Sequence, residues 1–113
     1  MADIRSVHAL MRAHDRHEAQ LDTLRDLLTE RLAAARAELA QAPAALRRTH
    51  PARRRIGELE AALDRMERGL YGICRGCGAF IEMSVLLHAP QDQECAECRR
   101  AGERRAGPRR AAV

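Results

Sequence analysis

The chain has 113 residues, 46% of them hydrophobic, yet Tyr71 and Phe80 are its only aromatic residues and it contains no Trp. This length allows one domain, and two aromatic side chains are too few for a large globular core. The formal net charge is +4, and positive charge gathers in residues 47–55, with five Arg and no acid, and in residues 99–113, with six Arg against Glu103. We expect two basic segments on an acidic body.

The start of the chain lacks the features of a secretory signal. Charged residues occur too early in it for such a signal, and no apolar run approaches the ~20 residues of a membrane span, so we expect a cytoplasmic protein without a membrane anchor.

The N-terminal half predicts one long helix. From Asp3 to Gln41 the chain contains no Pro or Gly. Apolar residues recur there at the spacing of one helix face. They are Leu21, Leu24, Leu28, Leu32, Ala35, Leu39 and Ala42.

Two histidines near the start of this helix, His14 and His17, lie three positions apart beside Asp15 and Glu18. This spacing suits two ligands of a metal ion on one helix face. Because no third ligand stands out, we interpret the group as a polar helix face.

A turn and a second helix follow. Pro51 suits the first turn of a helix, with Thr49 or His50 as its N-cap. The apolar residues after it alternate spacings of three and four, as in a coiled-coil seam. They are Ile56, Leu59, Leu63, Met66 and Leu70. We predict an antiparallel hairpin in which residues of about 21–42 pack against residues of about 52–70.

The tip of this hairpin, at about 43–51, is basic. Arg53, Arg54 and Arg55 would stand in the first turn of the second helix, where each cation opposes the helix dipole by about 0.3–1 kcal/mol. The tip is therefore either frayed or kept basic for a partner.

The only four cysteines are Cys74, Cys77, Cys95 and Cys98, which form two Cys-x-x-Cys pairs. Two such pairs supply the four thiolates of a structural Zn²⁺ site and leave no thiol over. Disulfides or a redox motif are the alternatives, but disulfides favour a secretory route and a redox pair normally occurs singly. Gly76 and Gly78 predict tight turns with positive φ and backbone N–H groups directed at sulfur.

Arginines next to the cysteines, at positions 75, 99 and 100, are either counter-charges for the thiolates or ordinary exposed residues. Four protein ligands leave no position for water or substrate, which argues against metal catalysis. No nucleophile motif or phosphate loop is present, so we expect no enzyme activity.

The stretch LDRMERGLYGICRGCGAFI, from Leu63 to Ile81, followed by Leu86, Pro90 and the second cysteine pair, resembles the zinc finger of the DksA/TraR family. The resemblance covers about a third of the chain. It implies a mainly α protein in which a coiled-coil hairpin joins a small four-Cys zinc finger and a short C-terminal helix. The corresponding segments are 1–70, 71–100 and a basic tail, 101–113.

The resemblance also implies a transcription regulator that binds RNA polymerase by inserting the hairpin into the secondary channel. We expect the protein to be a monomer. Well-known members carry paired acids at the tip, near the catalytic Mg²⁺. Here no Asp or Glu occurs from Pro43 to Arg55, and Glu82 and Val85 replace a usual Gly and Arg. These departures leave the fold in place and put the active-site mechanism in doubt.

Two other functions remain open from the residues alone. One is a small zinc module that binds nucleic acid weakly and nonspecifically through the basic tip and tail. The other is a zinc module whose partner is another protein. In the tail, we predict a short helix after Cys98 that is lost by Gly107 and Pro108, with disorder after about residue 106.

Overall fold

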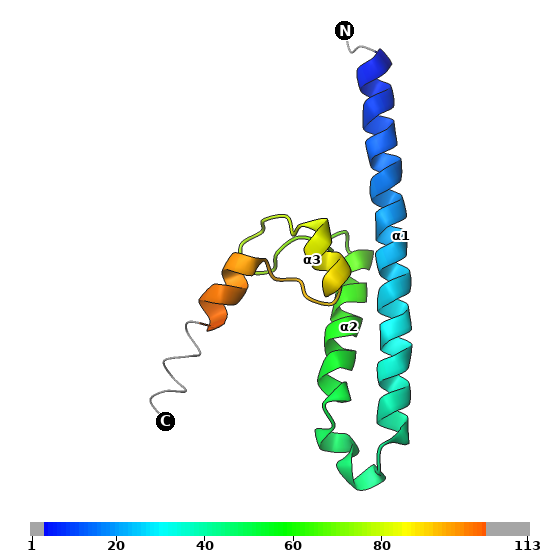
Figure 1. The fold of residues 1–113 in the computed structure, drawn as a ribbon, viewed down its shortest axis with the longest axis vertical. Helices are drawn as coiled ribbons and strands as arrows, with labels where there is room; N and C mark the ends of the chain where they lie inside the picture. The colour runs from blue at the N-terminus through cyan, green and yellow to red at the C-terminus, as the bar shows by residue number, and fades with distance from the viewer. Residues whose placement is uncertain (1–3, 104–113) are drawn as a thin grey trace.

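Two antiparallel helices joined by a short turn form the body of the molecule, and a small finger segment packs beside them (Figure 1). A computed structural model describes residues 4–103, with side chains from residue 7 onward. The elements are α1 (Ile4–Gln41), the 3₁₀ helix η1 (Ala44–Thr49), α2 (Ala52–Glu67) and α3 (Met83–His88). Residues 96–103 form a further helical segment. The predicted mainly α hairpin is confirmed.

The hairpin seam is built from the predicted apolar stripes. On α1 the buried residues include Leu24, Leu28, Leu32 and Ala35, and on α2 they include Leu59, Ala62 and Met66. Two ion pairs cross the seam: Arg36 lies 3.0 Å from Glu60, and Arg55 lies 2.8 Å from Glu38. Arg36 precedes Glu38 along α1, whereas along α2 the partner of Arg36 comes after the partner of Glu38. The two pairs therefore show that the helices run antiparallel.

The C-terminal end of α2 differs from the sequence prediction. Leu70 was expected in the seam, but the helix ends at Glu67 and Leu70 is exposed. Gly69 has a φ of 75°, and the backbone N–H of Leu70 donates to the Arg65 carbonyl at 2.9 Å. This is a Schellman C-cap with Gly69 at the left-handed position, and it turns Leu70 away from the seam.

The hairpin tip is an ordered 3₁₀ turn. Pro51 has helical dihedral angles, φ −57° and ψ −26°, as expected for a first-turn proline. The Nδ1 atom of His50 accepts the backbone N–H of Ala52 at 3.0 Å, so His50 caps α2 in the way that the sequence suggested. At the other side of the turn, the Arg47 guanidinium donates to the carbonyls of Ala40 and Ala42 at 2.9 and 3.0 Å.

The finger segment packs against the middle of α1. Ile81 and Leu86 belong to the same buried cluster as Leu24 and Leu28 of α1. Among residues 4–103 the only β pairing is an isolated bridge between Ile73 and Phe80. The first half of α1 extends beyond the finger as a free arm (Figure 1).

The C-terminal helical segment, 96–103, begins within the finger and confirms the predicted short helix. The predicted loss of helix at Gly107 and Pro108 and the disordered tail lie outside the described residues. Across the part of the chain that the structure describes, no helix has the length and apolar character needed to span a membrane.

Candidate metal centre

The four cysteine sulfurs converge on one point of the finger. All four Sγ atoms lie within 4.8 Å of one another, and those of Cys77 and Cys95 are 3.7 Å apart. Four thiolates placed tetrahedrally about 2.3 Å from one Zn²⁺ would be separated by about 3.8 Å. No disulfide joins them, because all four cysteines are free thiols. The cluster can therefore hold a metal ion between the two pairs.

Backbone N–H groups point at the sulfurs. Gly76 and Cys95 both donate to the Sγ of Cys74 at 3.3 Å, and Cys98 donates to the Sγ of Cys95 at 3.4 Å. These amide dipoles stabilise negative charge on sulfur, as the sequence led us to expect.

The two glycines of the first pair serve different purposes. Gly78 has a φ of 79°, in the left-handed region that favours glycine, as predicted. Gly76 is absent from the positive-φ positions, so that part of the prediction was wrong. A Cβ at Gly76 would lie 3.1 Å from the Sγ of Cys98, so a side chain there would force Cys98 to shift by a few tenths of an ångström.

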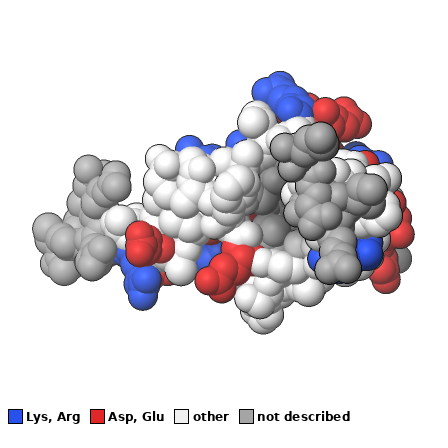
Figure 2. Space-filling view, turned by 90° about the horizontal axis from the view of Figure 1, so that it is seen from above, with Lys and Arg blue, Asp and Glu red and all other residues white. Residues whose placement is uncertain are grey.

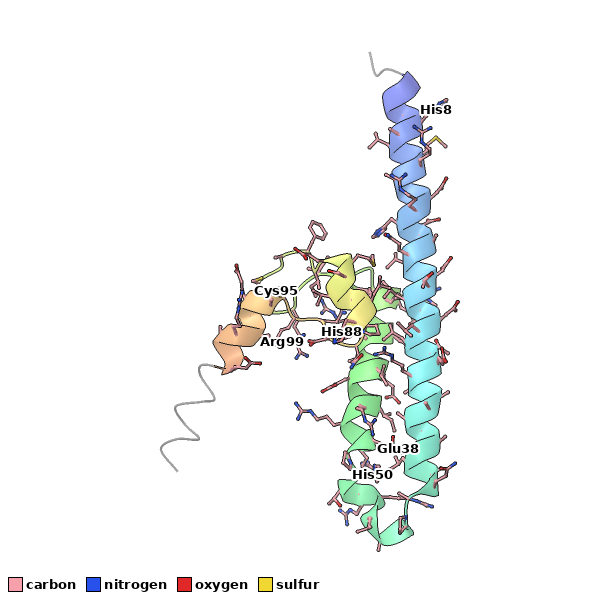
Figure 3. The ribbon with its side chains drawn as sticks, in the orientation of Figure 1. His8, Glu38, His50, His88, Cys95 and Arg99 are labelled. Carbon is pink, nitrogen blue, oxygen red and sulfur yellow. The ribbon has the colours of Figure 1, made fainter. Side chains whose placement is uncertain are left out.

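The arginines beside the cysteines bind carboxylates. Arg99 pairs with Asp92, and an Nη2 atom of Arg75 lies 4.0 Å from Glu94. Cys95 directly precedes the helical segment that contains Arg99 (Figure 3), and its carbonyl accepts the Arg99 backbone N–H at 3.0 Å. These two arginines therefore pair with acidic residues that directly precede the second cysteine pair.

The metal-free thiols differ in acidity. The hydrogen bond from the Cys95 backbone N–H lowers the pKa of Cys74 to about 6. The Cys95 side chain, followed by those of Cys74 and Cys77, raises the pKa of Cys98 to about 12. The cluster without metal thus retains protons at neutral pH. A bound cation displaces these protons, so metal affinity rises with pH.

Sequence reasoning missed the residue that links the two knuckles. Gln93 is buried, and its Oε1 accepts the N–H of Gly72 at 2.9 Å while its backbone carbonyl accepts the N–H of Arg75 at 2.9 Å. Its Nε2 also donates to the Pro90 carbonyl at 3.3 Å. No motif marks a glutamine for this task, and Gln93 lies among other polar residues, so the sequence does not single it out as a buried hydrogen-bonding residue.

A second missed residue joins the finger to the hairpin. Arg65 of α2 donates through Nη2 to the carbonyls of Leu70 at 3.1 Å and Ile73 at 2.7 Å. These bonds fix the chain between the end of α2 and the first cysteine. The finger therefore has a defined position relative to α2.

The remaining candidates are not brought together. His14 lies 3.1 Å from Glu18, one turn along the same exposed helix face. Within the described residues, the cysteines are the sole group of three or more potential metal ligands that converge. The polar-face interpretation of His14 and His17 agrees with this arrangement.

Comparison with known proteins gives short or distant matches. No family model matches the chain. An uncharacterized protein of Aquifex aeolicus (strain VF5) is 40% identical over 52 residues, which is 46% of this chain and 36% of the Aquifex protein. The chain thus spans about a third of the length of this relative. The solved structure of the RNA polymerase binding protein and transcriptional regulator Dks from Chlamydia trachomatis matches with 24% identity and a TM-score of 0.43, over 66% of this chain and 89% of that one. A TM-score this low does not by itself define a shared fold.

Proposed function

We propose that this chain is a DksA/TraR-like transcription regulator of the cytoplasm that binds RNA polymerase through the secondary channel. The observation that carries the proposal is the attachment of a four-cysteine finger, with the motif from Gly69 to Cys77, to an antiparallel helical hairpin with a free tip. The polymerase binding of the Chlamydia protein agrees with this partner but adds no independent support.

The metal in this proposal is Zn²⁺, held by Cys74, Cys77, Cys95 and Cys98. Four thiolates in a closed tetrahedral set are typical of structural zinc, and the N–H groups directed at Cys74 and Cys95 favour the charged sulfurs. Its role is to fold the finger, and zinc binding of this kind contributes roughly 10 kcal/mol or more.

The hairpin is a long, narrow pair of helices that ends in an exposed turn. The 16 residues of α2 span about 24 Å at ~1.5 Å per residue, and the tip beyond them is fully exposed from Pro43 to Thr49. The exposed apex carries Leu46, 57% accessible, and Arg48, which follows it by two positions. An apolar side chain and a free cation at the end of a rigid pair of helices suit contact with a protein channel.

Nonspecific nucleic-acid binding through the tip has less support. Arg47 binds carbonyls of α1, Arg54 pairs with Glu58, and Arg55 pairs with Glu38. These contacts leave few of the tip arginines for phosphates. Neither of the two aromatic residues lies in the tip, so no stacking platform for bases is available there.

The proposal is tested with purified zinc-loaded protein and core RNA polymerase. A photo-cross-linking amino acid at Leu46 should label polymerase subunits that line the secondary channel, whereas the same group at Asp26, on the exposed face of α1, should label little. A Cys98→Ser variant should lose both bound zinc and cross-linking. Cross-linking only to nuclease-sensitive material would favour the nucleic-acid function, and equal labelling from both positions would contradict insertion of the tip.

A further inference from the structure

The finger carries a groove between α3 and the C-terminal helical segment. Two hollows of about 400 and about 380 Å³ adjoin there, because Val85 of α3 and both Ala96 and Arg100 of the C-terminal segment line each of them. The larger hollow extends to His88 and the other extends to Phe80. We call the two together the finger groove, with a histidine end and an aromatic end. Valine and alanine fill little of the space between the two helical segments, so a bulky side chain of another molecule can enter.

Phe80, at the aromatic end, is the only phenylalanine of the chain and is 87% exposed. Its backbone pairs with Ile73 in the isolated bridge, while the next residue, Ile81, is buried in the core cluster. Because successive side chains of an extended segment point to opposite sides, the burial of Ile81 directs the Phe80 ring into water. A partner that covers the ring therefore gains the free energy of its burial.

Charged side chains are few on this part of the molecule, and they are divided along the groove. Figure 2 looks down on the finger from the N-terminal end of α1 and shows mostly uncharged residues there. Glu82 and Glu97 line the aromatic end only. Arg99 lines the histidine end and already pairs with Asp92, whereas no ion pair among the described side chains includes Arg100. A ligand in the groove thus meets two carboxylates at the aromatic end and one unpaired guanidinium in the middle.

This division of charge favours a protein segment over a nucleic acid. A nucleic acid that stacked a base on Phe80 would bring its phosphates beside Glu82 and Glu97, which repel them. A polypeptide can instead place a bulky apolar side chain between the two helical segments and a carboxylate at Arg100. Toward the aromatic end it needs a neutral or basic residue. The complementary segment is therefore neutral or basic, then apolar, then acidic.

We propose that the finger groove binds a surface segment of RNA polymerase that presents a bulky apolar side chain next to a carboxylate. This inference rests on the proposed function, because it takes polymerase as the partner, and it adds a second contact to that of the tip. In Figure 1 the finger projects from the side of the hairpin, and it follows the end of α2 that is remote from the tip. A hairpin inserted tip first therefore leaves the groove outside the channel, where it meets the polymerase surface.

The first test measures the affinity of full-length, zinc-loaded protein for core RNA polymerase. Phe80→Ala should raise the dissociation constant at least ~10-fold, because the ring is an apolar anchor of the contact. Leu87→Ala is the matched control, since this leucine is also exposed on the finger but lies on the side of α3 that faces α1. It should change the dissociation constant little. Zinc content and melting temperature should be unaltered in both variants, because neither side chain is buried.

Charge reversal tests the carboxylate. Arg100→Glu should also raise the dissociation constant at least ~10-fold, because it places like charges opposite each other. Arg25→Glu makes the same change at an exposed position of α1 outside the groove and should have little effect. A benzophenone analogue of phenylalanine at position 80 should cross-link to a polymerase peptide that contains the expected carboxylate. Replacing that carboxylate by arginine should restore the binding of Arg100→Glu.

The outcomes separate this inference from the proposed function. If Phe80→Ala and Arg100→Glu bind like the unaltered protein while Leu46 still cross-links to polymerase, the groove contact is overturned and the proposed function stands. Unaltered protein that does not bind polymerase at all would overturn both. Cross-linking from position 80 to nucleic acid, and not to protein, would overturn the protein partner of the groove.

Discussion

At Gly76 the space for a side chain is taken by the sulfur of Cys98. The backbone there turns so that its N–H reaches Cys74, and the same turn brings Cys98 within 3.1 Å of where a Cβ would be. This contact, and not a positive φ, is what favours glycine at this position. Such a preference cannot be derived from the Cys-x-x-Cys spacing, which says nothing of how closely the second pair approaches the first.

We predict that Gly76→Ala weakens zinc binding, because the added methyl group pushes Cys98 out of position. Competition with a chromogenic chelator measures the loss. Gly57→Ala provides the control: this glycine lies in α2 with open space around its Cα, and alanine there should stabilise the protein by up to about 1 kcal/mol. Similar zinc affinity in both variants would contradict the close approach at Gly76.

The tyrosine of the finger gives a prediction about pH. The Tyr71 hydroxyl donates to the Pro90 carbonyl at 2.8 Å, and burial raises the pKa of Tyr71 from 10.0 to about 12. The folded state therefore binds this proton more tightly than the unfolded state does. The stabilisation is complete below about pH 10 and is lost as the pH rises through about 12.

We expect the free energy of unfolding of zinc-loaded protein to fall between about pH 10 and about pH 12, and this fall to be smaller in Tyr71→Phe. At neutral pH the same substitution should cost about 1 kcal/mol for the lost hydrogen bond. Because Tyr71 is the only tyrosine, its phenolate absorbance follows this group alone. A phenolate titration near the ordinary tyrosine value would show that the hydroxyl is not buried.

At the scale of the elements, the apolar periodicity predicted which residues are buried, but it did not predict where α2 ends. The stripes through Leu24, Leu28 and Leu59 identified the seam because a helix repeats its faces regularly. The end of α2 was placed three residues late, since Leu70 fits the repeat and the Schellman turn at Gly69 overrides it. The sequence signal for this turn was Gly69, directly before the apolar Leu70.

The basic tip shows a second limit of the sequence. Arginines in the first turn of α2 looked unfavourable because the sequence does not reveal their partners. In the fold, Arg55 reaches Glu38 across the hairpin and Arg54 reaches Glu58 one turn along. These exposed pairs contribute modestly, but they offset the unfavourable dipole interaction. The tip is therefore folded as a 3₁₀ helix and not frayed, and a tip kept basic for a partner stays a prediction.

Arg47 should be the arginine on which the tip depends most. Its guanidinium satisfies two carbonyls at the end of α1, so Arg47→Ala should destabilise the hairpin by about 1 kcal/mol, whereas Arg48→Ala, one residue later and exposed, should have little effect. Thermal unfolding followed by circular dichroism compares the two. If both variants melted alike, the cap at Arg47 would have no energetic role.

For the whole molecule, the finger and the hairpin behave as one unit because shared residues join them. Ile81 and Leu86 pack on α1, and Arg65 binds the carbonyls that lead into the first knuckle. The cysteine spacing and the resemblance were enough to predict that a finger exists and follows the hairpin. They did not predict the position of the finger along α1, which depends on side-chain packing between segments far apart in sequence.

The composition of the tip predicts that binding to polymerase and an effect on the polymerase active site are separate properties of this protein. If the hairpin enters the secondary channel as proposed, its tip brings Leu46, Arg48 and Arg53 toward the active site, with no carboxylate from Pro43 to Arg55. A carboxylate near the catalytic Mg²⁺ attracts the metal, whereas a guanidinium repels it. We therefore predict that the unaltered protein binds polymerase without the active-site effects of relatives with acidic tips.

In vitro transcription from a ribosomal promoter, beside a binding assay at the same concentrations, measures both properties. Adding acids at the exposed apex, Ala45→Asp with Arg48→Asp, should leave polymerase binding within a few-fold and introduce inhibition, because neither residue supports the fold and the new carboxylates face the metal. Arg48→Ala should bind in the same way and remain inactive, which separates the loss of a cation from the gain of an acid. Strong inhibition by the unaltered protein would contradict the prediction, since an acid-free tip has no group with which to attract the catalytic metal.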